Sequence, residues 1–102
     1  MVYVLALITT KPGLRDTVLE AFTSNVAAVR AENGCIEYGA TVDTEGAGPI
    51  QTEVGPDTFI VVEKWQSVEA LQAHAASDHM AAYGAMVKDM IDSRRIHVLS
   101  PV

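Results

Sequence analysis

The pattern of apolar and polar positions divides the chain into segments with strand-like and helix-like periods. Residues 2–10 are rich in β-branched side chains and almost continuously apolar, which is typical of a strand buried on both faces. After a break at Lys11-Pro12-Gly13 the period changes to three or four residues, which predicts a helix with one apolar face that ends at Asn33-Gly34. Its apolar positions are Leu14, Val18, Phe22, Val26 and Val29.

The second half of the chain repeats this alternation. Residues 35–42 and 58–65 read as strands, joined by a long loop, and a last strand follows at residues 94–99. Ser67 is a predicted N-cap of a short helix, and Ser77 begins a second helix that runs to about Asp92. One face of the second strand would carry Ile36, Tyr38, Ala40 and Val42, and one face of the third Phe59, Val61, Glu63 and Trp65. The apolar stripe of the last helix would be Met80, Tyr83, Met86, Val87, Met90 and Ile91.

The order strand, helix, strand, strand, helix pair, strand predicts an α+β fold. It matches a ferredoxin-like split βαβ arrangement with a four-stranded antiparallel sheet, and the length of 102 residues predicts a single domain over 1–102. Both faces of the first and third strands are apolar, and helices would cover only one face. We therefore expect a second sheet from a homodimer to cover the other.

Charge and cysteine content limit which classes of partner and which cellular compartment the sequence predicts. The net charge of −6 argues against nucleic acid and anionic membranes as partners. Cys35 is the only cysteine, so no internal disulfide is predicted, which fits a reducing compartment. No signal segment or membrane span is recognisable, so we expect a cytoplasmic protein.

Several short motifs, in this order and spacing, carry a resemblance to a known family. They are Lys11-Pro12-Gly13 after the first strand, residues 30–38 (RAENGCIEY), residues 63–65 (EKW), residues 69–74 (EALQAH) and Ser77-Asp78-His79. With them the chain resembles the antibiotic biosynthesis monooxygenase family of dimeric α+β barrels over nearly its whole length. The resemblance implies the barrel fold and a homodimer.

The resemblance leaves several activities open. Members include cofactor-independent oxygenases of phenolic polyketides, quinol oxygenases, isomerases of small phosphorylated sugars and haem-degrading enzymes. The haem-degrading branch uses an asparagine on the first strand and a tryptophan on the penultimate helix. This chain has no asparagine there, and His74 takes the tryptophan's place, so its residues do not fit haem degradation.

Two histidines are the candidate catalytic residues. A cofactor-free oxygenase must remove a proton from an electron-rich substrate, and an imidazole suits this role because it titrates near pH 6.5. His79 and His74 are therefore the candidate bases. The alternative is that one or both cap helices or form local hydrogen bonds, and their spacing of five residues does not decide whether they share a pocket.

Four further residues are candidates for substrate binding: Trp65, Tyr83, Tyr38 and Glu63. Trp65 could stack on a flat ring, and the tyrosine hydroxyls could orient a phenolate. Tyr83 would share a wall with His79, one turn earlier on the same helix. Core packing is the alternative for all three aromatic residues, and a structural ion pair with Arg30, Arg94 or Arg95 is the alternative for Glu63.

No metal site or cofactor is predicted. None of the three histidines stands at the usual short spacing from another histidine or a carboxylate, and no glycine-rich phosphate loop joins a strand to a helix. Together with these residues, the family resemblance implies a homodimeric, cofactor-independent monooxygenase that oxidises a small phenolic, polyketide or quinol substrate with O2. An isomerase or tautomerase using the same pocket and a non-catalytic ligand-binding dimer domain are the alternatives.

Overall fold

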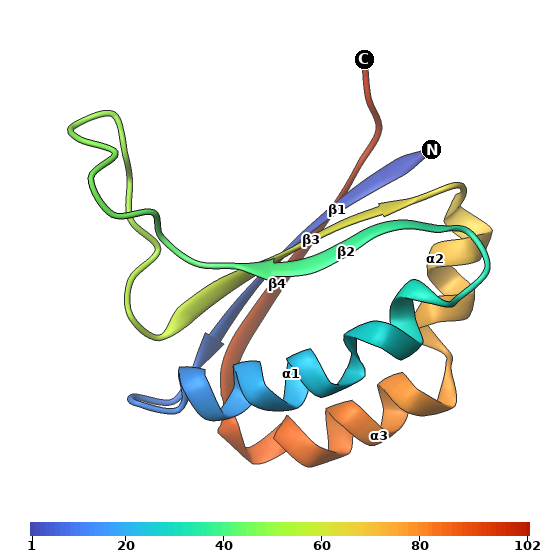
Figure 1. Ribbon diagram of the computed structural model, residues 1–102, viewed down its shortest axis with the longest axis horizontal. Helices are drawn as coiled ribbons and strands as arrows, with labels where there is room; N and C mark the ends of the chain where they lie inside the picture. The colour runs from blue at the N-terminus through green and yellow to red at the C-terminus, as the bar shows by residue number, and fades with distance from the viewer.

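A four-stranded antiparallel sheet carries all the helices on one of its faces (Figure 1). The computed structural model describes residues 1–102. Its elements are β1 (Val2–Thr10), α1 (Arg15–Arg30), β2 (Cys35–Thr41), β3 (Thr58–Trp65), α2 (Val68–Ala75), α3 (Asp78–Val87), the 3-10 helix η1 (Lys88–Met90) and β4 (Ile91–Leu99). The strand order is β2-β3-β1-β4, which confirms the predicted ferredoxin-like α+β arrangement.

The two central strands, β1 and β3, build the core. They pair antiparallel, with Val4 opposite Glu63 and Ile8 opposite Phe59. Even-numbered positions of β1 and odd-numbered positions of β3 are buried under the helices, which confirms the predicted face of the third strand. Trp65 and Phe59 are fully buried at its two ends.

Helix α1 covers the sheet with the predicted stripe. Val18, Phe22 and Val29 are buried, and the ring of Phe22 stacks on Tyr38 of β2 with centroids 5.2 Å apart. The cap of α2 is also confirmed, because the Ser67 hydroxyl accepts a hydrogen bond from the backbone N–H of Ala70.

The predicted face of the second strand is wrong at Ile36. The register between β2 and β3 shifts between Cys35 and Glu37, so β2 holds one extra residue there and the alternation breaks. Ile36 is consequently 49% exposed. Because β2 is an edge strand, only one neighbour constrains its register, and a bulge is tolerated.

The predicted end of the last helix is also wrong. Helix α3 stops at Val87, one 3-10 turn follows, and β4 begins at Ile91 rather than at Arg94. Pairing with β1 explains the early start, since Ile91 lies opposite Thr10 and the Lys11 N–H donates to the Met90 carbonyl. Met86, which was predicted in the apolar stripe, is 62% exposed.

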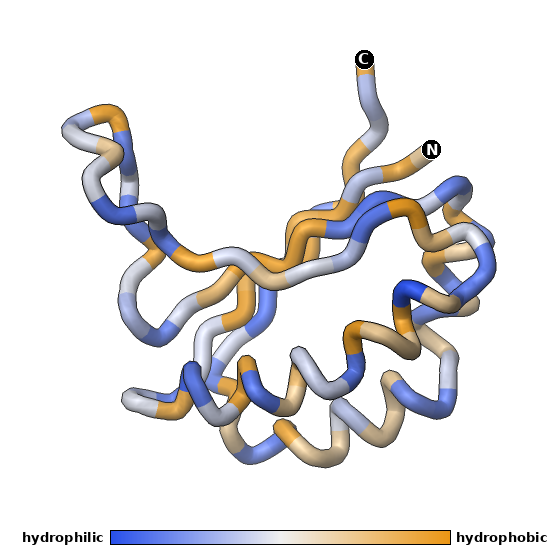
Figure 2. The backbone as a smooth tube through the Cα atoms, in the orientation of Figure 1, coloured by the Kyte–Doolittle hydropathy of each residue, from blue (hydrophilic) through white to orange (hydrophobic).

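The sheet face opposite the helices is open. Its apolar side chains, here called the open face, are Tyr3, Leu5, Leu7, Ile60, Val62 and Leu99. Figure 2 shows hydrophobic positions recurring along the strands of the sheet. Leu5, at the centre, is 36% exposed.

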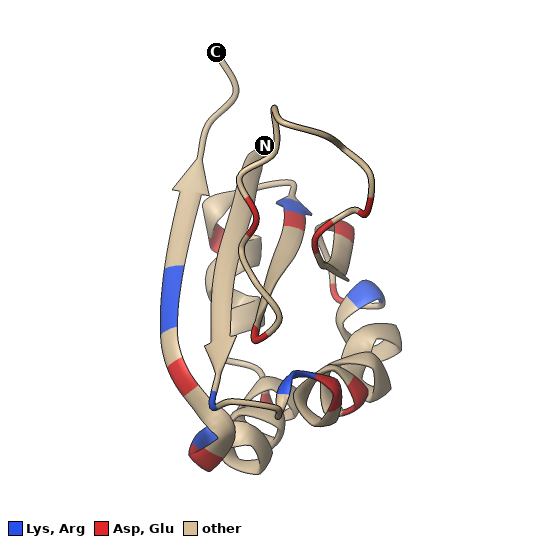
Figure 3. Cartoon of the chain, turned by 90° about the vertical axis from the view of Figure 1, so that its left-hand side faces the viewer, with Lys and Arg blue, Asp and Glu red and all other residues tan.

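The segment between β2 and β3 extends away from the helical layer (Figure 1). The Asp43 carboxylate ties its two ends together by accepting hydrogen bonds from the N–H groups of Val54 and Gly55, which hold its pKa below the usual range. Acidic side chains are spread over this segment and the helices, and a basic band crosses β4, where Arg94 and Arg95 lie (Figure 3). None of the helices has the length and apolarity needed to cross a membrane.

Candidate functional site

A pocket of about 900 Å³ lies between the helix-facing side of the sheet and helices α2 and α3. Of its 22 lining residues 15 are hydrophobic, so the interior favours an apolar molecule. The polar groups include Glu63 on β3, Tyr38 on β2, His74 on α2, Tyr83 on α3 and Arg94 on β4. The pocket therefore combines apolar walls with a small number of ionisable groups that could orient a substrate.

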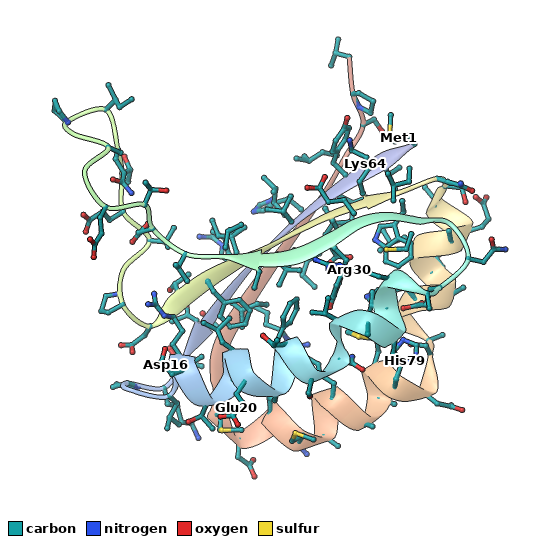
Figure 4. All side chains as sticks on the ribbon, in the orientation of Figure 1. Met1, Asp16, Glu20, Arg30, Lys64 and His79 are labelled. Carbon is teal, nitrogen blue, oxygen red and sulfur yellow. The ribbon has the colours of Figure 1, made fainter.

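Glu63 is a buried carboxyl group in the pocket wall. The indole N–H of Trp65 donates a hydrogen bond to Glu63 Oε1 at 2.9 Å, within the same strand face. Burial raises the pKa of Glu63, while the Trp65 hydrogen bond and the nearby His74 oppose the rise. No arginine forms an ion pair with this buried group, so the structure does not show the alternative in which Glu63 pairs with Arg30, Arg94 or Arg95. Arg30 instead donates from Nε to the Tyr38 carbonyl, and it rises from α1 towards β2 (Figure 4).

His74 lies beside Glu63, at the end of α2. Its Nε2 is 4.0 Å from Glu63 Oε1, and its Nδ1 is 2.8 Å from Oε2 of Glu32. A carboxylate only accepts hydrogen bonds, so Nδ1–H of His74 donates to Glu32, and in a neutral ring this arrangement leaves Nε2, on the side of Glu63, without a proton. The ring is held between Trp65, at a centroid distance of 4.7 Å, and Tyr38, at 5.4 Å.

His79 shares Glu32 with His74 from the other side. Its Nε2 is 2.9 Å from the same Oε2 atom, and Ser77 Oγ lies 3.3 Å from it. The side chain of His79 is 32% exposed, against 5% for His74 and 15% for Glu32. His79 does not line the pocket and lies at the end of the helical layer where α2 meets α3 (Figure 4).

The two tyrosines of the pocket remain protonated phenols. Burial, reinforced by the charge of Glu63, raises the pKa of Tyr38 far above its usual range. Burial also raises the pKa of Tyr83, and the Arg94 guanidinium partly counteracts this rise. Both hydroxyls can therefore donate hydrogen bonds to a bound anion at ordinary pH.

Local sequence signals hold Glu32 against the two histidines. Gly34 has φ +88°, a conformation that favours glycine, and a Cβ placed there would lie 2.6 Å from Ala70 Cβ. The turn after α1 can therefore approach α2 closely, which brings Glu32 within reach of His74. Ser77 fixes the other side, because its hydroxyl donates to the His74 carbonyl at the junction of α2 and α3.

The sequence profile of the antibiotic biosynthesis monooxygenase family matches residues 1–86 of this chain. This match covers β1, β2, β3, α1 and α2 and all but the last residue of α3. The chain belongs to the antibiotic biosynthesis monooxygenase family. It is therefore related to enzymes that insert an oxygen atom into their substrates, as the resemblance of its motifs predicts.

Relatives support this assignment over the whole chain. A protein of Escherichia coli named probable quinol monooxygenase YgiN is 37% identical over 103 residues, covering 99% of this chain and 98% of its own. Among solved structures, PA3566 from Pseudomonas aeruginosa has a TM-score of 0.81 at 23% identity, covering 99% of this chain and 93% of its own. Rv0793 from Mycobacterium tuberculosis has a TM-score of 0.80 at 24% identity, covering 99% and 94%. These structures show the shared fold.

Within this monooxygenase fold, the structure brings together some of the predicted site residues and separates others. His74, Glu63, Tyr38 and Tyr83 line one pocket. Trp65 is fully buried behind His74 and does not line it. Tyr83 does not share a wall with His79: its ring packs edge-on against Phe22, with centroids 6.1 Å apart.

Sequence reasoning missed Glu32, the residue that joins the two histidines. It is 42 residues from His74 and 47 from His79, so no short-range spacing reveals the contact. One ligand atom from each of the three side chains lies within 4.8 Å of the others, and such a set could hold a metal ion. The one available signal was the position of Glu32 beside Asn33-Gly34, where the chain turns back towards the sheet.

Proposed function

We propose that this member of the family is a cofactor-independent monooxygenase that oxidises a small quinol or phenol with O2. The observation that carries the proposal is a histidine in the wall of a mostly apolar pocket, with one ring nitrogen held by the Glu32 carboxylate and the other facing Glu63. The quinol as substrate class is supported by the similarity to the Escherichia coli relative named probable quinol monooxygenase and by the pocket's apolar walls and phenol donors.

His74 is the proposed base. Its Nε2 takes the phenolic proton, and Glu32 acts as a positioning residue that fixes the tautomer and stabilises the imidazolium that forms. The same carboxylate–imidazole pair acts as a general base in many enzymes; here the imidazole would take a proton from the substrate itself and not from a protein nucleophile. His79 is proposed as a second partner of Glu32, through which the proton taken up at His74 passes to solvent.

The proposed reaction needs only the quinol and O2. Loss of the proton gives an electron-rich quinolate, which passes one electron to O2. Recombination of the two radicals forms a carbon–oxygen bond. The resulting hydroperoxide adduct loses water, so that one quinol and one O2 give one hydroxylated quinone and one H2O. One oxygen atom enters the product and the other leaves in water, and the quinol supplies all four electrons.

The remaining polar residues are proposed to bind the quinolate. The hydroxyls of Tyr38 and Tyr83 donate to its oxygens, and the Arg94 guanidinium beside Tyr83 stabilises the negative charge. Trp65 acts indirectly, by packing against the His74 ring and by holding Glu63. The apolar walls exclude water, which strengthens these interactions and keeps the reactive anion from side reactions.

A homodimer is proposed as the working form. Helices cover only one face of the sheet, and the open face presents six apolar side chains, from Tyr3 and Leu5 on β1 to Leu99 on β4. A second copy packed on this face would complete the α+β barrel of the family. We also propose a cytoplasmic location, where the single thiol of Cys35 would stay reduced.

The base assignment is tested by the steady-state kinetics of histidine variants with a hydroquinone. We expect His74→Ala to lower kcat/KM by roughly 10²–10⁴-fold, the usual range for a general base. His79→Ala should lower it by about tenfold or less, because His79 stands one step further from the pocket. His97→Asn, which removes the third histidine on β4 beside Leu5 of the open face, is the control for the loss of an imidazole on the side of the sheet away from the pocket. Full activity of a folded His74→Ala variant would refute the assignment.

A further inference from the structure

We propose that Glu32, His74 and His79 form a Zn²⁺ site, and that the bound ion switches off the base. The three ligand atoms are Glu32 Oε2, His74 Nδ1 and His79 Nε2, and all lie within 4.8 Å of one another. The second half of this inference rests on the proposed function, in which His74 takes the substrate proton. The ion is a regulator in this proposal and takes no part in the oxidation.

The ligand set and its spacing suit zinc. Two imidazoles and one carboxylate, with one position left open, form a common zinc environment. On a tetrahedral ion with bonds of about 2.0–2.1 Å, ligand atoms stand roughly 3.3–3.4 Å apart. Here Oε2 is 2.8 Å from one nitrogen and 2.9 Å from the other, so small side-chain movements would admit the ion in place of the two hydrogen bonds.

The three ligands are held by separate parts of the chain. Glu32 follows α1, where its carbonyl accepts from the Cys35 N–H, while His74 ends α2 and His79 begins α3. The Ser77 hydroxyl links the two histidine segments through the His74 carbonyl. The site is therefore organised by the fold rather than by a flexible loop, and the partly exposed His79 provides an entry path for the ion.

Glu63 is a second carboxylate, placed where it could accept a hydrogen bond from a zinc-bound His74. Metal-bound histidines usually donate their other ring N–H to a carboxylate or carbonyl, which orients the ring. The other nitrogen of His74, Nε2, faces Glu63 Oε1 at 4.0 Å, and the Trp65 indole holds that oxygen in place. Glu63 would thus become the outer partner of a zinc-bound His74.

Coordination would reverse the roles of the two His74 nitrogens. In the metal-free protein the contact with Glu32 favours the tautomer of the neutral His74 ring that carries its proton on Nδ1 and leaves Nε2 unprotonated beside Glu63. An ion bound at Nδ1 uses the lone pair of that atom, so the single proton of the neutral ring moves to Nε2. The pocket-facing nitrogen then donates instead of accepting, and it cannot take the proton of a quinol. Zn²⁺ would be a reversible inhibitor whose effect needs no contact with the substrate.

Zinc binding is measured directly by competition with a chromophoric chelator, using full-length, metal-free protein without an affinity tag. We expect one Zn²⁺ per chain and no comparable binding of Mg²⁺, which prefers oxygen ligands. Glu32→Gln and His79→Asn should each weaken binding about tenfold or more, whereas His97→Asn should leave it unchanged. The site is refuted if the wild type binds no Zn²⁺, or if binding depends on His97 and not on Glu32 and His79.

Two further readouts connect the ion to the base. In ¹⁵N spectra of the wild type, Zn²⁺ should move the His74 proton from Nδ1 to Nε2; an unchanged tautomer would refute the proposed switch even if zinc binds. Zn²⁺ should also stop oxygen uptake with a hydroquinone, and EDTA should restore it.

The two proposals can fail separately, because the titration needs no turnover. Zinc binding without any oxygen uptake would keep the site and reject the proposed function. Full turnover by a protein that fails to bind added Zn²⁺ in the titration would keep the function and reject the site.

Discussion

At the scale of single residues, the most unusual group is the buried carboxyl of Glu63. It is only 7% exposed and has no cationic side chain at hydrogen-bond distance, and the Trp65 indole is its one hydrogen-bond donor. Burial is the main reason why its pKa is raised. A folded-state pKa above the unfolded value means that ionisation of Glu63 opposes folding.

Glu63→Gln should therefore stabilise the protein at pH 8. The amide keeps an oxygen that accepts from Trp65 but carries no charge. The wild type suffers no penalty below the unfolded pKa and loses stability as the pH rises through the raised folded pKa. The melting temperature of the variant should exceed that of the wild type by a few degrees at pH 8, the shift expected for about 1 kcal/mol of stability. This difference in melting temperature should shrink towards pH 4. A variant less stable than the wild type at pH 8 would contradict this account of Glu63.

At the scale of elements, the site depends on the turn between α1 and β2. Gly34 adopts φ +88°, and Ala70 of α2 occupies the space that a Cβ would need. Gly13 provides a comparison, because it has φ +79° with nothing within 4 Å of its Cβ position. The two glycines thus separate the cost of the left-handed backbone from the cost of the contact.

Gly34→Ala should be more destabilising than Gly13→Ala. In both variants the alanine must adopt the left-handed backbone conformation, which costs roughly 1–2 kcal/mol of folding free energy. Only Gly34→Ala also pushes α2 away from the turn, so we expect it to lower the free energy of unfolding by about 2–4 kcal/mol in total. It should also lower activity, because Glu32 moves away from His74. Chemical denaturation of both variants measures the difference. Equal losses would mean that the Gly34–Ala70 approach does not hold the site together.

The same elements show what the sequence could predict. The alternation of β3 and the stripe of α1 are local patterns, and they were sufficient for the fold and for grouping Glu63 with Trp65 on one strand face, but they did not decide which histidine faces the pocket. The bulge at Ile36 depends on pairing with β3, and the early start of β4 depends on pairing with β1, so neither could be predicted from its own segment. The Glu32–His74–His79 cluster needs three segments in place at once.

At the scale of the whole molecule, the open face is the main apolar surface that no other part of the chain covers. A monomer would leave the apolar side chains of β1 and β3 in water, where Leu5 at the centre is 36% exposed. The proposed homodimer would cover this face with a second copy of the chain. The pocket proposed to bind the substrate lies on the other side of the sheet, so the two surfaces can be altered separately.

A charge placed on the open face should break the proposed dimer. We expect Leu5→Glu to be a monomer by light scattering at micromolar concentration, because burying unpaired carboxylates at the interface is strongly unfavourable. Ile50→Glu is the matched control, since Ile50 is 92% exposed on the β2–β3 loop, and it should remain a dimer. A monomeric wild type, or an equal effect of both changes, would contradict the proposed interface.

The central claim is that the metal-free protein inserts one atom of O2 into a quinol. The most direct measurement is mass spectrometry of the product formed under ¹⁸O2, with no flavin, nicotinamide or metal added and with His74→Ala in parallel. The account predicts a hydroxylated quinone with one ¹⁸O atom, formed by the wild type far faster than by the variant. Product without ¹⁸O, or conversion that proceeds equally well under argon, would show that the pocket does not perform a monooxygenase reaction.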